Sequence, residues 1–305
     1  MFTDRRLFLK KITRASSGVV VGGTLLSARF LQQAHARYAL KGELLGKSLP
    51  LLNDKEAEEL AHLPQKAQDD IRQYFHGVCL NVHGFTERVC SNGFAEKLKS
   101  CASDEQKHAL LNVAFSQKVA TGIEVLNRVD VIAGEIGAEL DRNWSKLCGQ
   151  LNDSWKLTLK SAMPSDQRLD LVAVTQDTIL QSLGDARSRA YPLGQRPALS
   201  ETISEIGKAA ILLLPVAAGE PQVAFPWFLI RALVSAWSYV LGRLAHPAAD
   251  YQLAITEHLA ALGNRVAAEC EQEVRRRIAD LHTYQQQAID VAATKKVNQI
   301  IGALI

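Results

Sequence analysis

The chain has 305 residues, with 35 Lys and Arg against 32 Asp and Glu, which gives a formal net charge of +3 at pH 7. Hydrophobic residues make up 47% of the sequence and charged residues 22%, proportions that exclude a disordered or collagen-like chain. The length is sufficient for one large domain or two small ones, each with a buried core.

The positive charge is concentrated at the N-terminus. The first 36 residues hold six basic residues against a single acidic one, Asp4. Without them, the totals of 35 and 32 fall to 29 basic and 31 acidic residues, a net charge of −2. The remaining chain therefore lacks the basic field that nucleic-acid binding requires, and we expect no nucleic-acid partner.

The N-terminal 36 residues carry the features of an export signal in the expected order. Two arginines are followed, after one spacer residue, by Phe, Leu and Lys, and these residues are Arg5, Arg6, Phe8, Leu9 and Lys10. A weakly apolar stretch over residues 15–28 comes next, and Ala34 and Ala36 then form an A-x-A cleavage motif. The segment resembles a bacterial twin-arginine signal, with Asp4 where a Ser or Thr usually stands.

This resemblance implies that the twin-arginine export machinery is a partner and that the protein folds before it reaches the periplasm. It also implies that residues 1–36 are removed. Residues 37–305 show no clear domain boundary, and we expect them to form a single all-helical domain. The alternative is an uncleaved N-terminal anchor helix. Arg29 interrupts the apolar run in either interpretation.

Helical periodicity recurs along the rest of the chain, whereas the period-two alternation of strands is nearly absent. The sequence predicts an all-α fold, an elongated bundle of long amphipathic helices around an apolar hairpin or central helix. The predicted helices cover residues 53–63, 65–90, 94–99, 103–159, 165–183, 200–244 and 247–299.

Two of these predicted helices carry apolar residues at heptad-like spacing, as expected for faces that pack against other helices. The first set is Ile71, Phe75, Val78, Val82, Phe85 and Val89. The second set is Leu259, Leu262, Val266, Cys270, Val274, Ile278 and Leu281.

Short polar motifs predict where several helices begin and end. Asn53 with Glu56, and Ser103 with Gln106, have the spacing of capping boxes at helix N-termini. The run at residues 91–93, Ser-Asn-Gly, has the composition of a helix C-cap.

The stretch over residues 209–245 is the most apolar in the chain. Residues 209–230 include one charge, Glu220, among 22 residues. Pro215, Pro221 and Pro226 make one unbroken membrane span unfavourable and favour two apolar arms around a turn. The arms are similar to the apolar hairpin of helical pore-forming toxins such as colicins, a resemblance of architecture alone.

Three roles are open to this segment: the buried centre of the bundle, a membrane-associated hairpin, or a surface that binds a protein partner. We expect binding to a membrane surface or a protein partner to depend on its large apolar side chains. These candidate binding residues are Leu213, Phe225, Trp227, Phe228 and Trp237.

Histidine and cysteine residues form a stripe over residues 76–90. In a continuous helix, Cys79 and His83 would be one turn apart and would supply two ligands of a metal or haem site. The alternative is the polar edge of a packed helix. Cys90 and Cys101 flank the predicted break at residues 91–93, and we expect them to form a disulfide in the oxidising periplasm.

The absence of common catalytic motifs favours a binding role over catalysis. The sequence contains no phosphate-binding loop, GxGxxG, GxSxG or HExxH motif, and it identifies no cofactor. The charge run at residues 275–277 predicts helical ion pairs of Glu271 with Arg275 and of Glu273 with Arg277.

Overall fold

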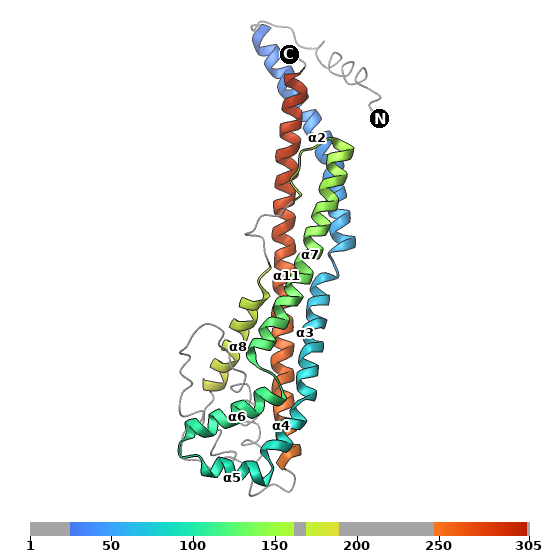
Figure 1. Cartoon of the computed structure of the whole chain (residues 1–305). Helices are drawn as coiled ribbons and strands as arrows, with labels where there is room; N and C mark the ends of the chain where they lie inside the picture. Colours follow the sequence, from blue (N-terminus) through green and yellow to red (C-terminus); the bar gives the residue numbers. More distant parts are fainter. Residues whose placement is uncertain (1–24, 162–168, 189–246, 304–305) are drawn as a thin grey trace. The chain divides into compact units, whose positions relative to one another are not determined.

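The computed structural model describes residues 25–161, 169–188 and 247–303, and within these ranges all regular structure is α-helical (Figure 1). The predicted all-α class is therefore confirmed. The helices are α2 (Leu25–Glu59), α3 (Leu63–Leu80), α4 (Val82–Val89), α5 (Asn92–Ser100), α6 (Asp104–Lys118), α7 (Gly122–Trp155), α8 (Leu171–Ser188) and α11 (Pro247–Gly302). The predicted apolar hairpin lies outside the described residues.

Contacts between residues divide the chain into two compact units, which are described separately. The first unit comprises Met1–Ala61, Glu139–Gln167 and Ile278–Ile305, and the second comprises His62–Ala138 and Arg168–Arg277. The long helices α7 and α11 contribute residues to both units. The single domain predicted for the mature chain stays a prediction.

In the first unit, segments of α2, α7 and α11 enclose an apolar core. The core residues of α7 are spaced by four, three and four positions, so they share one face of the helix. They are Leu140, Trp144, Leu147 and Leu151, none more than 2% exposed. Leu52 of α2 and Ile289 of α11 pack in the same core.

An ion pair joins α2 to α11 in the first unit. Lys41 Nζ lies 2.7 Å from one carboxylate oxygen of Asp290 and 2.9 Å from the other. Residues 32–39 are exposed or half-buried. Lys41 therefore anchors this part of α2 to α11.

The first predicted apolar seam is confirmed as core of the second unit, and the second is confirmed in part, because Ile278 is half-buried and lies with the buried Leu281 in the first unit. The six residues of the first seam, now divided between α3 and α4, are all 4% exposed or less. On α11, the seam residues from Leu259 to Val274 are buried as well. Phe85 of α4 meets Phe115 of α6 edge to face, with ring centroids 5.2 Å apart. Apolar periodicity thus identified the packed faces of these helices correctly.

The predicted helix over residues 65–90 is in fact two helices, α3 and α4, which meet at Asn81. The Asn81 N–H donates to the Val78 carbonyl at 3.2 Å, a bond that tightens the last turn of α3. The Asn81 amide also donates to the carbonyl of Val119 at 3.5 Å. A tertiary contact therefore accompanies the break, and a heptad pattern does not reveal such a contact.

The run at residues 91–93 begins a helix instead of ending one. The Ser91 hydroxyl accepts a hydrogen bond from the Phe94 N–H at 3.4 Å, so Ser91 is the N-cap of α5. The expected helix start at Asn53 is also wrong, because residues 53–59 continue α2 without interruption.

The capping box at the start of α6 is confirmed. The Ser103 hydroxyl accepts from the Gln106 N–H at 3.3 Å, and Gln106 Oε1 accepts from the Ala102 N–H at 2.8 Å. A second box, which the sequence analysis missed, divides the predicted helix over residues 103–159. The Thr121 hydroxyl accepts from the Glu124 N–H at 3.1 Å, and the Glu124 carboxylate accepts from the Thr121 N–H at 2.7 Å.

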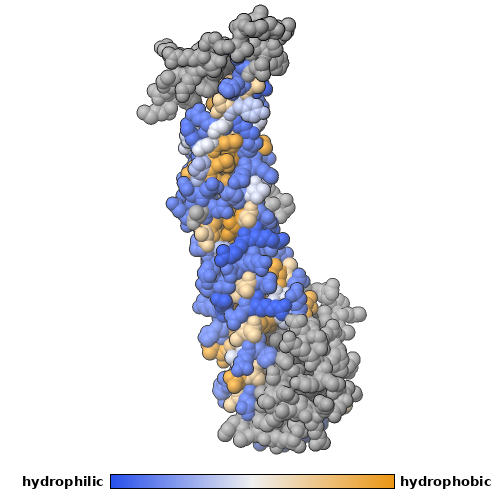
Figure 2. All heavy atoms as spheres, turned by 180° about the vertical axis from the view of Figure 1, so that it is seen from behind, coloured by the Kyte–Doolittle hydropathy of each residue, from blue (hydrophilic) through white to orange (hydrophobic). Residues whose placement is uncertain are grey.

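The described helices have a predominantly polar surface. On the face shown in Figure 2, hydrophilic residues cover most of the described part and hydrophobic residues occur as separate patches. Tyr38, Leu80, Leu253 and Val291 are the most exposed large hydrophobic residues among those described. No helix in the described ranges is both long and apolar enough to cross a membrane.

Candidate functional site

The structure places the predicted metal ligands Cys79 and His83 in different surroundings. Cys79 lies near the end of α3 and is 7% exposed, and its thiol donates to the carbonyl of Thr256 at 3.7 Å. His83 lies on α4, beyond the break at Asn81, and its side chain is 59% exposed.

Both ring nitrogens of His83 have protein partners. Nδ1 lies 3.0 Å from the amide oxygen of Gln252, and Nε2 lies 3.1 Å from the Glu87 carboxylate. Within residues 25–161, 169–188 and 247–303, no group of three or more His, Cys, Asp or Glu side chains is arranged to hold a metal ion. Metal binding by Cys79 and His83 stays a prediction.

The predicted disulfide between Cys90 and Cys101 is corrected by the structure, in which both residues are free thiols. They lie at opposite ends of α5, because Cys90 directly follows α4 and Cys101 is the C-cap of α5. The nine residues of α5 span about 14 Å at the rise of an α-helix. A disulfide requires α-carbons within about 7 Å of each other.

The other three cysteines, Cys79, Cys148 and Cys270, are also free thiols, and all three are buried. Burial raises the pKa of the Cys90 and Cys270 thiols to about 11 and that of Cys148 to about 12. Burial also raises the pKa of Cys79. These four thiols are therefore protonated at neutral pH, whereas nucleophilic or metal-binding cysteines act as thiolates.

The remaining predicted site residues fall mostly outside the described part of the chain. The export-signal residues Arg5, Arg6, Phe8, Leu9 and Lys10 lie there, as do the candidate binding residues Leu213, Phe225, Trp227, Phe228 and Trp237. Ala34 and Ala36 of the cleavage motif are described, and they lie within α2.

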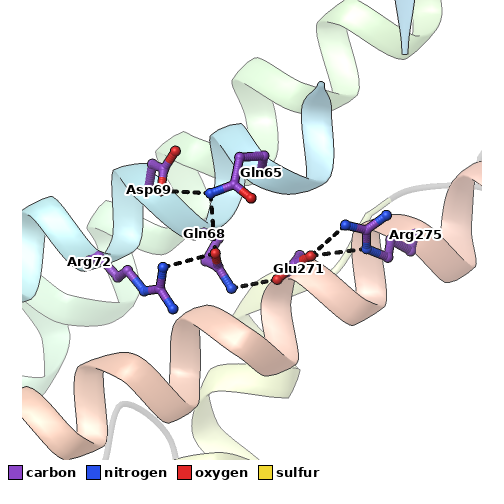
Figure 3. Close-up of polar contacts among 6 residues, drawn as sticks. All are labelled: Gln65, Gln68, Asp69, Arg72, Glu271 and Arg275. Atoms are coloured by element: carbon purple, nitrogen blue, oxygen red, sulfur yellow. Dashed lines mark hydrogen bonds and ion pairs between the residues drawn. The ribbon is translucent and has the colours of Figure 1, made fainter. Parts of the chain in front are cut away.

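A polar network joins α3 to α11 in the second unit (Figure 3). The amide nitrogen of Gln68 donates to Glu271, whose carboxylate also accepts two bonds from Arg275, at 3.0 and 2.6 Å. The Gln68 oxygen in turn accepts from Arg72 at 2.9 Å and from Gln65 at 3.2 Å.

This network contains one of the two ion pairs predicted for the charge run at residues 275–277. The predicted pair of Glu271 with Arg275 is confirmed. Glu273 pairs with Arg276, three residues away, at 2.8 Å. The i,i+3 and i,i+4 positions are both neighbours on a helix surface. The pair of Glu273 with Arg277 stays a prediction.

A second polar cluster lies in the first unit and includes two carboxylates of α2. Glu59 accepts from Lys55 at 2.7 Å and from Asn143 of α7 at 3.1 Å. The hydrogen bond from Lys55 lowers the pKa of the Glu59 carboxyl, and Asn143 lowers it further. The other carboxylate, Glu56, faces Nδ1 of His282 on α11.

Gln285, one turn after His282, is 1% exposed, and its Nε2 has no hydrogen-bond partner among the described residues. His282 Nε2 lies 2.6 Å from the Gln286 amide nitrogen. With Nδ1 facing Glu56, both ring nitrogens of His282 are in polar contacts. The contact with Glu56 joins α2 to α11, whereas the contact with Gln286 lies within α11.

No protein-family profile, curated protein or solved structure matches this chain.

Proposed function

We propose that this chain is an exported, non-enzymatic helical protein that binds a protein partner or a membrane surface through residues 209–245. The observation that supports the proposal is the contrast between this segment and the described helices. Residues 209–230 carry one charge in 22 residues. The described helices present a mainly hydrophilic surface on the face in Figure 2, and none of them is both long and apolar enough to cross a membrane. An apolar sequence of that length favours burial against a partner or lipid.

Export by the twin-arginine machinery to the periplasm is the second part of the proposal. It is supported by the arginine pair with its Phe-Leu-Lys sequence and by the A-x-A motif at residues 34–36. The motif precedes Lys41, whose ion pair with Asp290 joins α2 to α11. Removal of residues 1–36 would therefore leave that ion pair in place.

A role in binding is also consistent with the chemistry of the described side chains. The carboxylates of Glu56, Glu59 and Glu271 are engaged with neighbouring helices, where they contribute to structure. The buried thiols remain protonated at neutral pH.

Photo-crosslinking and vesicle flotation test the proposal together. A photoreactive amino acid placed at Trp227 is expected to form an adduct with a lipid or a partner protein in the periplasm. The same amino acid at Val291, which is 67% exposed on α11, is the matched control and is expected to form none. Adduct formation at both positions, or at neither, contradicts binding through residues 209–245.

Flotation distinguishes lipid from protein partners. Purified full-length protein is mixed with vesicles of phosphatidylethanolamine and phosphatidylglycerol. A variant that combines Phe225→Ser, Trp227→Ser and Phe228→Ser is tested in the same way. Flotation of the parent and loss by the variant favour the membrane. If neither the parent nor the variant floats, the adduct formed at Trp227 is expected to contain a protein.

A further inference from the structure

We draw no further inference here: the strongest candidate, the half-buried pair of Glu56 on α2 and His282 on α11 beside the buried amide of Gln285, belongs to the polar cluster already described, and nothing among the described residues points to a ligand or a partner for it.

Discussion

Gly263 of α11 faces Phe75 of α3 so closely that a β-carbon at Gly263 would lie 2.5 Å from both Cβ and Cγ of Phe75. Phe75 is itself buried, at 2% exposed. The absence of a side chain at position 263 therefore allows these two helices of the second unit to approach each other.

We expect Gly263→Ala to destabilise the protein by about 1–3 kcal/mol. A close-packed interior cannot move a phenyl ring away at low cost, and this cost exceeds the gain in helix propensity from replacing glycine. Urea denaturation of the variant and the parent measures the difference.

The matched control is Gly134→Ala on α7, where a β-carbon would meet no other atom within 4 Å. We expect this variant to be more stable than the parent by roughly 0.5–1 kcal/mol, because alanine favours the helix without a clash. Equal effects of the two substitutions would contradict a specific contact at Gly263.

The capping box at Thr121 and Glu124 is expected to contribute to the stability of α7. Thr121→Ala removes the hydroxyl that accepts from the Glu124 N–H, and we expect a loss of about 1 kcal/mol. Thr121→Ser retains the acceptor and should lose much less. Thermal unfolding of the two variants makes the comparison, and a similar loss in both would indicate that the threonine methyl group, not the cap, is responsible.

Glu59 is expected to make the stability of the first unit depend on acidity. Its pKa is lowered in the folded protein, chiefly by the hydrogen bond from Lys55, from an ordinary value of 4.5. Its contribution to stability is therefore complete above that value and is lost as the pH falls through the lowered folded pKa. At pH 7 we expect Glu59→Gln to lower the midpoint of thermal unfolding, and at pH 3 we expect the difference from the parent to shrink.

The control for this acidity test is Asp153→Asn, which alters an exposed carboxylate of the same unit. Its unfolding midpoint should differ little from that of the parent at either pH. A difference between Glu59→Gln and the parent that stays constant from pH 7 to pH 3 would rule out the carboxylate as the cause.

Removal of the N-terminal segment is expected to leave the fold intact. A chain that begins at Arg37 keeps the ion pair of Lys41 with Asp290 and the packing of Leu45 on the core. We expect its thermal midpoint to lie within measurement error of the full-length value. A chain that begins at Ser48 loses both contacts and should unfold at a lower temperature, and equal midpoints for all three would place the anchoring of α2 further along the chain.

The sequence by itself predicted the helical class and the faces on which α3, α4 and α11 pack. Helix formation and amphipathic periodicity are local properties, so residues three and four apart, such as Phe75 and Val78, carry the signal without knowledge of the fold. The capping box at Ser103 is local in the same sense. The box at Thr121 was also readable from its spacing to Glu124, and it was overlooked within a long apolar pattern.

Only the tertiary structure decided where these helices end and what their polar side chains do. The break at Asn81 and the approach of Gly263 to Phe75 both depend on neighbours far away in sequence. The return of residues 157–161 along α7 was missed for the same reason, although the alternation from Leu157 to Lys160 was a signal in the sequence. Spacing along a chain determines which residues share a face, whereas the partner of that face is determined by how distant segments pack together.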